Sequence, residues 1–169
     1  MKYLKVILVI ITAAIFNGCN TYSFTGISVD ADSFQVKHFQ NNAELVEPGI
    51  ELTFTNKLQE LIQNQTRLNL TDSNPDLVYE GEITQYRISP MTATANQGAA
   101  QNRLSITVNV RFSNKNASEG DFEKPFSFYH DYNGNDLPTG SVLTTALDEI
   151  FERIGQDIFN ESLTNWSKT

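Results

Sequence analysis

The sequence predicts an α+β fold, a two-layer sandwich in which two helices pack on one face of a mostly antiparallel or mixed four-stranded sheet. Residues 103–113 alternate between apolar and polar side chains, as expected for a strand with one packed face. Residues 50–62 and 143–159 instead repeat apolar side chains at helical spacing. Because the order is strand, helix, several strands, helix, each layer offers an apolar face that the other can bury.

Four stretches have the alternation of strands, and a fifth is strand-like but short. They are residues 34–39, 77–89, 103–113 and 122–132, with residues 68–70 as the short one. The phase of the alternation changes within residues 77–89, which predicts a bulge near Gly81. Pro125 lacks a backbone donor, so its strand is expected at an edge of the sheet.

The expected helices span residues 50–64 and 142–165, and each has one apolar face. We expect both helices on the same face of the sheet. Val108 in the cleanest strand and Ile154 in the second helix then belong to the core.

The N-terminus has the layout of a secretory signal peptide. Lys2 and Lys5 precede an apolar stretch, residues 6–16, that ends just before the only cysteine, Cys19. About eleven apolar residues are too few to span a bilayer, which takes roughly 20. Gly18 before Cys19 resembles a bacterial lipobox, so we expect cleavage after residue 18 and a covalent lipid on Cys19 as membrane anchor. The alternative is an ordinary signal peptide whose cleavage site contains a cysteine.

The charge balance excludes one class of partner. The chain has 12 basic and 20 acidic side chains, and removal of residues 1–18 takes two of the basic ones away. A domain this acidic has no basic surface for nucleic acid. Beyond the signal peptide we expect a lipidated tether, residues 19–33, and one domain, residues 34–169, long enough to bury a core.

No catalytic motif is visible, because the sequence has no GxSxG, HExxH, CxxC or glycine-rich phosphate loop. His38 and His130 lie in predicted strands, but no third metal ligand accompanies them. Residues 131–136 resemble the start of a calcium loop, yet Asp136 replaces its glycine and Val142 its final glutamate. We therefore expect no enzyme, no metal site and no cofactor beyond the lipid on Cys19.

Several stretches of the sequence together resemble those of a known protein family. They are Tyr22–Gly26, Phe39–Ala43, Phe54–Leu70, Glu80–Ile83 with Tyr86 and Pro90, and Arg103–Phe112. Together they resemble the LptE family, the lipopolysaccharide-assembly lipoproteins of the outer membrane. The resemblance covers nearly the whole chain after residue 18 and rests on core and turn residues.

This resemblance implies a lipid-anchored outer-membrane lipoprotein whose domain faces the periplasm and the lumen of an LptD-type β-barrel. There it acts as a plug that supports barrel assembly and the transport of lipopolysaccharide to the outer leaflet. Since the family's lipid contacts are basic, Arg87, Arg103 and Arg111 are candidate contacts for lipopolysaccharide phosphates. Ordinary surface arginines are the alternative.

Residues 90–102 join two long strands and contain no charge and no large apolar side chain beyond Met91. Connections of this length are usually functional or mobile. An uncharged loop enters a protein lumen without burying a charge, so Thr94 and Gln97 are candidate barrel contacts. A surface loop without a role is the alternative.

A second class of function stays open, a periplasmic or surface lipoprotein that binds a soluble ligand. It predicts a concave apolar pocket with convergent polar groups, whereas a plug predicts a convex polar surface. An enzyme predicts clustered groups with perturbed pKa values.

Overall fold

The structure, a computed structural model, describes residues 30–45, 47–91, 101–134 and 137–164. The predicted lipidation site Cys19 and the predicted barrel contacts Thr94 and Gln97 lie outside these residues. The described strands are β1 (Ser33–Val36), β2 (Gln40–Asn41), β3 (Asn69–Leu70), β4 (Leu77–Met91), β5 (Gln101–Asn114) and β6 (Phe122–Asn133). The helices are α2 (Ile50–Gln65) and α3 (Gly140–Phe159), and α3 continues into a π-helical turn, Asn160–Thr164.

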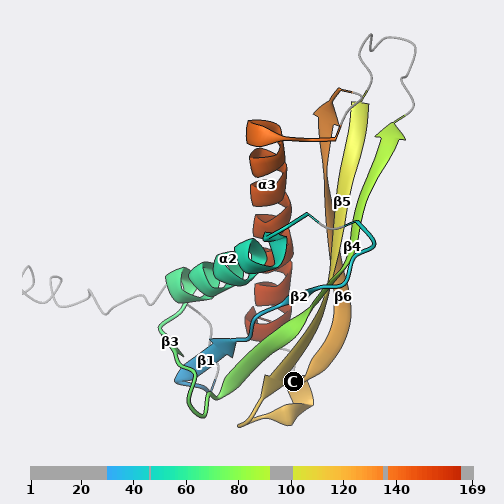
Figure 1. The fold of residues 1–169 in the computed structure, drawn as a ribbon. Coiled ribbons are helices and arrows are strands. Elements are labelled where there is room, and N and C mark those ends of the chain that lie inside the picture. The colour runs from blue at the N-terminus through green and yellow to red at the C-terminus, as the bar shows by residue number, and fades with distance from the viewer. Residues whose placement is uncertain (1–29, 46, 92–100, 135–136, 165–169) are drawn as a thin grey trace, which may run out of the picture.

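The fold is α+β with one mixed sheet and two helices, as the sequence predicts (Figure 1). The strand order is β3-β1-β4-β5-β6, and β2 pairs with β4 beyond the end of β1. The three short strands pair in parallel, and β4, β5 and β6 form an antiparallel meander. The predicted number of four strands is wrong, because the described residues already form a sheet of six. Strands β2 and β3 have 2 residues each, too few for an alternation to be visible.

The long strands extend beyond their predicted ends. Residues 90, 91, 101 and 102, expected in the connection, are paired between β4 and β5. Strand β6, which contains Pro125, lies at an edge of the sheet as expected.

Both helices pack on the same face of the sheet (Figure 1). Helix α3 runs along β6, and α2 crosses α3 and lies nearer to β1. The ring of Phe54 on α2 meets Phe39 and Phe151, with centroids 4.9 and 5.2 Å away. Val108 and Ile154 are fully buried, which confirms their predicted place in the core. Burying one such side chain contributes about 1.5–3 kcal/mol.

The bulge in β4 lies at Thr84, where the register shifts between Ile83 and Gln85, and not at Gly81. Gly81 has another role. A Cβ atom there would collide with the backbone oxygen of Asn109 and come within 2.9 Å of the Phe39 ring. The absent side chain thus lets Phe39 pack directly on the sheet. Because the bulge adds one residue, the alternation of the side chains resumes with Arg87 on the face away from the helices.

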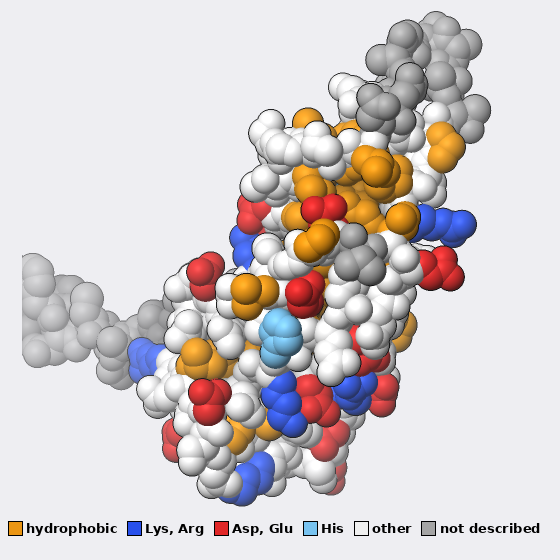
Figure 2. All heavy atoms as spheres, viewed as in Figure 1, with side chains coloured by type: hydrophobic (Ala, Val, Ile, Leu, Met, Phe, Trp, Pro, Cys, Tyr) orange, Lys and Arg blue, Asp and Glu red, His pale blue; other side chains and the backbone are white. Residues whose placement is uncertain are grey.

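Apolar side chains gather on the surface near the end of the molecule where α3 begins (Figure 2). Leu45, Leu137 and Val142 are exposed by 51%, 67% and 44%. No helix within the described part of the chain is long and apolar enough to span a membrane.

Candidate functional site

The candidate site is the outer face of the sheet, the face turned away from α2 and α3. Along β5 it consists of every second side chain, which are those of Arg103, Ser105, Thr107, Asn109 and Arg111. The alternate residues of β5 are buried against the helices. This strand forms one packed and one polar face because its sequence alternates strictly.

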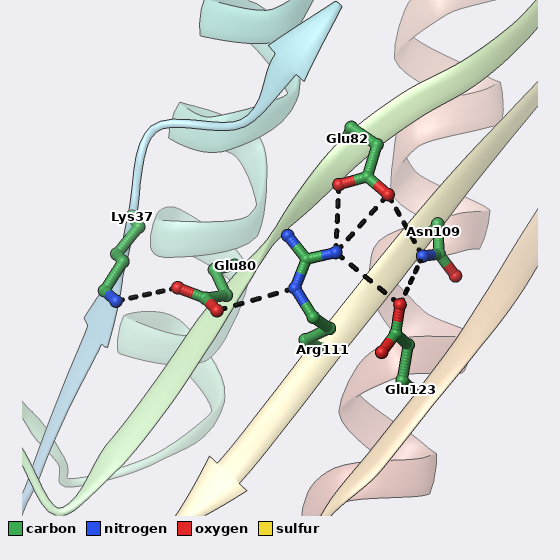
Figure 3. A network of polar contacts seen from close by, with 6 residues as sticks. All are labelled: Lys37, Glu80, Glu82, Asn109, Arg111 and Glu123. Carbon is green, nitrogen blue, oxygen red and sulfur yellow. Dashed lines mark hydrogen bonds and ion pairs between the residues drawn. The ribbon is translucent and has the colours of Figure 1, made fainter. Parts of the chain in front are cut away.

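Arg111 lies at the centre of a network of carboxylates (Figure 3). Its Nη1 is 3.0 Å from Glu82 and 3.6 Å from Glu123, and its Nε is 3.5 Å from Glu80. Lys37 binds the other oxygen of Glu80 at 2.7 Å. The hydrogen bond from Lys37, followed by that from Arg111, lowers the pKa of Glu80, whereas burial opposes this shift. The network holds three strands and the end of β1 together on this face.

The middle of the outer face is uncharged. The hydroxyl of Thr107 lies 3.3 Å from Gln85 Oε1 and 3.1 Å from Ser127 Oγ, so three neighbouring strands share one hydrogen-bonded row. Thr84, at the bulge, adds a bond of 3.3 Å to the backbone oxygen of Thr107. Such a row meets another polar surface without bringing a charge out of water.

Arg103 is occupied by its neighbour on β6. Its Nε and Nη2 bind the two oxygens of Asp131 at 2.6 and 2.8 Å, and its guanidinium lies 3.6 Å from the centre of the Tyr129 ring. The hydrogen bond from Arg103 lowers the pKa of Asp131. Asp131, the first residue of the calcium-like turn, is therefore bound to an arginine.

Arg87 differs from the other two candidate arginines. It is exposed on the outer face, and the described residues give it no ion-pair partner. The structure thus brings the three predicted arginines to one face, two of them neutralised by carboxylates and one open. Lys37 and Glu123 belong to this face as well, and sequence reasoning missed both. The feature that could have identified these two residues is their charge, which is opposite to that of residues on the neighbouring strands. This feature can be used only when the register between the strands is known.

The outer face is balanced in charge although the protein is acidic. The ion pairs and the alternation place four basic and four acidic side chains on it: Lys37, Arg87, Arg103, Arg111, Glu80, Glu82, Glu123 and Asp131. The two helices instead carry Lys57 and Arg153 against six carboxylates, at positions 51, 60, 148, 149, 152 and 157. An anionic partner is therefore repelled by the helices more than by the outer face.

The described surface includes two hollows, one of which borders the outer face at Arg87. One, of about 300 Å³, lies between the helices, where Lys57 binds Asp148 at 2.7 Å and Glu152 at 3.0 Å. The other, of about 470 Å³, follows the edge of β4 beside Leu45. Both are lined in part by charged side chains. Neither is the apolar pocket with convergent polar groups that a soluble-ligand protein needs.

The two histidines do not form a metal site in the described residues. Nδ1 of His130 lies 2.7 Å from Oε2 of Glu149 on α3, so this side chain joins the sheet to a helix. No group of three or more histidine, cysteine, aspartate or glutamate side chains with metal-binding geometry occurs in the part of the chain that the structure describes.

The fold and the face define a class: a sheet-and-helix domain with a polar, charge-balanced outer surface and a separate buried core. Residues 31–162 match the LptE family, which is described as lipopolysaccharide-assembly. The chain belongs to the LptE family, which is a non-enzymatic family of outer-membrane lipoproteins for lipopolysaccharide assembly. This confirms the expected family and the expectation that the protein is not an enzyme.

Solved structures share the fold. One is lipoprotein B from Nitrosomonas europaea, with a TM-score of 0.50 and 12% identity over 88% of this chain and 94% of that one. Another, from Helicobacter pylori, is described as a neuraminyllactose-binding hemagglutinin homolog, with a TM-score of 0.51 and 8% identity over 84% of this chain and 91% of that one. At such low identity the likeness concerns the fold alone. A comparison with curated protein sequences gives no match.

Proposed function

We propose that this protein is a lipid-anchored outer-membrane lipoprotein that plugs an LptD-type β-barrel and supports its assembly for lipopolysaccharide transport to the outer leaflet. Membership of the LptE family supports the part of this proposal that concerns lipopolysaccharide assembly. The anchor is a lipid on Cys19, as the apolar stretch that ends before this residue indicates.

The observation that carries the proposal is the charge balance of the outer face. A surface that enters a protein lumen loses water, and an unpaired charge on it is costly. On this face Arg103 and Arg111 are already bound to carboxylates, and the row through Thr107 is uncharged. Apart from Arg87, the face therefore packs against a polar wall at a low electrostatic cost.

Lipopolysaccharide phosphates bind, in this proposal, at Arg87, Arg103 and Arg111. Arg87 offers its whole guanidinium, while Arg103 and Arg111 offer the N–H groups that their carboxylates leave free. Thr94 and Gln97, outside the described residues, are proposed as contacts to the inner wall of the barrel.

Depletion of the protein in cells tests the function. We expect less correctly assembled barrel and an outer membrane that is leaky to large or hydrophobic antibiotics, because a barrel without its plug assembles poorly and leaves a pore. The barrel is measured by its migration in native gels, and expression of the wild-type chain from a second copy is the control. Normal barrel assembly and normal permeability in depleted cells would contradict the proposal.

A further inference from the structure

Strand β4 has a vacant neighbour position along half its length. It spans 15 residues and pairs on one side with β5 along nearly all of them. On its other side, β1 pairs with residues 77–79 and β2 with Glu82 and Ile83. Within the described residues no strand pairs with this side beyond Ile83 (Figure 1). The free edge therefore starts at the bulge and continues to Met91.

The main-chain groups of Tyr86 and Ile88 face this free edge. Pro90 pairs with Asn102 across the ladder and has no N–H, so its position is one whose main-chain groups turn away from β5. The direction of the main-chain N–H and C=O groups alternates from one residue to the next along an antiparallel ladder. Tyr86 and Ile88 lie four and two residues before Pro90, so their main-chain groups face the same way as those of Pro90. Two N–H and two C=O groups thus lie at the edge, between the bulge at Thr84 and the proline.

A groove of about 470 Å³ lies along this edge. It is lined by Glu44 and Leu45, where the chain leaves β2, and by residues 84–88 of β4. Ile88 packs partly buried against the core, while Leu45 is 51% exposed. The groove therefore has an apolar side.

We propose that this groove accepts an extended segment of the barrel partner, which adds a strand to the sheet beside Gln85–Ser89. The proposal rests on the proposed function and names the contact through which the partner is held. Unpaired main-chain donors and acceptors at strand spacing are matched by another strand, and not by a helix or a lipid tail. The bulge and Pro90 limit the added strand to about five residues.

The side chains around the groove define the chemistry of this segment. One face of the added strand carries apolar residues that cover Ile88 and Leu45. The other face lies beside Arg87 and carries a carboxylate or another acceptor. The guanidinium has five N–H donors, so this contact leaves donors for a phosphate.

A second copy of this chain fits the edge poorly. Antiparallel pairing of two copies through Gln85–Ser89 centres on Arg87 and places the two guanidinium groups opposite each other. Like charges directly opposite destabilise a strand pair. Each chain is also acidic, with a formal net charge of −8, which adds repulsion between copies.

Site-specific photo-crosslinking of the full-length protein in cells tests the proposal. Crosslinkers replace Gln85, Arg87 and Ser89 one at a time, because these side chains are two residues apart on the outer face. We expect all three to capture one short peptide of the barrel, at positions that advance by about two residues per step. The same crosslinker at Ser127 and Tyr129, on the opposite edge strand β6, gives the background of an unrelated sheet edge.

A matched pair of variants tests the main-chain contact. Ile88→Pro replaces the side chain by a ring and removes the outward N–H, whereas Ile88→Ala shortens the side chain and keeps the N–H. The melting temperatures of both variants show whether they are folded. We expect Ile88→Pro to retain about fivefold to tenfold less barrel than Ile88→Ala in a mild-detergent pull-down.

The outcomes separate this inference from the proposed function. A barrel that copurifies with the wild type, but gives unordered crosslinks or none at these three positions, would overturn strand addition and leave the plug intact. Ordered crosslinks to a second copy of this chain would also overturn it. If no barrel copurifies with the wild type, the proposed function itself is wrong.

Discussion

Asp76 fastens the start of β1 to the start of β4. Its Oδ2 accepts hydrogen bonds from the backbone N–H of Asp32 at 3.0 Å and of Ser33 at 3.1 Å, and from the Ser33 hydroxyl at 2.8 Å. The N–H of Asp76 returns a bond of 3.1 Å to Ser33 Oγ. One carboxylate therefore satisfies the backbone where the sheet begins.

This arrangement predicts a pH dependence of stability. The hydrogen bonds from Asp32 and Ser33 lower the pKa of Asp76 below its ordinary value of 3.8. A lowered pKa means that the contribution is complete above the ordinary value and is lost as the pH falls through the lowered one. We expect Asp76→Asn to unfold at lower denaturant than the wild type at pH 7, with the gap closing under strongly acidic conditions. Urea titrations at several pH values measure this, with Asp157→Asn on the exposed side of α3 as control. An equal gap at every pH would contradict it.

At the residue scale, sequence reasoning identified types of side chain but not their partners. Glu80 and Glu82, for example, both bind Arg111. That contact depends on the pairing of β4 with β5, and the alternation of each strand does not give their relative register. The burial of Val108 was predictable because it follows from alternation alone.

At the scale of the element, Gly81 decides how closely Phe39 packs on the sheet. We expect Gly81→Ala to destabilise the protein by about 2 kcal/mol or more, because its Cβ meets the backbone of Asn109, which cannot move out of the sheet. Gly155→Ala on α3 is the control, since its Cβ meets only the flexible end of Leu61, at 3.3 Å. Thermal unfolding compares the two. Equal losses of stability would show that the close approach of Gly81 to the backbone of Asn109 does not determine the effect of the substitution.

The two layers should depend on each other for burial. Val108→Asp in the sheet and Ile154→Asp in α3 both place an unpaired charge at a fully buried position. We expect each to cost more than about 3 kcal/mol, whereas Ser113→Asp at an exposed position of β5 should stay within about 0.5 kcal/mol. Chemical denaturation gives the free energies of unfolding. A variant of Val108 or Ile154 that keeps the wild-type value would remove that residue from the core.

The long elements were predictable from sequence, and the short strands β1 and β3 overlap stretches that the sequence indicated, whereas β2 was not anticipated. Strands β4, β5 and β6 and both helices repeat their patterns often enough to be recognised. Strand β2 has no room for a repeat, and the position of the bulge, at Thr84 and not at Gly81, depends on the pairing between strands. The vacant position beside β4 follows from these short strands, so it was not predictable either.

At the scale of the whole molecule, the direction of the sheet determines which end of the domain lies nearest to the predicted anchor. The described chain enters at Asp30, beside the start of β1, and β4 runs from there to Met91 at the far end (Figure 1). Between Cys19 and Asp30 a fully extended chain reaches at most about 40 Å. A lipid on Cys19, as proposed, would therefore keep the entry end within this distance of the membrane.

The anchor itself is directly testable. We expect mass spectrometry of membrane-extracted protein to show loss of residues 1–18 and a gain of lipid mass on Cys19. Cys19→Ser should carry no lipid mass and, in cells depleted of the barrel, leave the membrane fraction, because without acyl chains or barrel the acidic domain has no membrane affinity. An unmodified thiol on the wild-type protein would contradict this prediction.

The distribution of charge over the surface of the molecule could not be predicted from the sequence. Composition shows the acidic excess, and the resemblance to the LptE family indicated the function. Only the arrangement of the strands shows that the outer face is neutral, whereas the helices carry four more acidic than basic side chains. This separation makes the outer face suitable for contact with a barrel wall.

We propose that one copy of this chain fills one LptD-type barrel. Native mass spectrometry of the complex, extracted from outer membranes in mild detergent through a tag on this chain, measures it most directly. We predict a dominant species whose mass equals one lipidated chain plus one barrel. A chain that is recovered alone, or only as copies of itself, from membranes that contain the barrel would contradict the account.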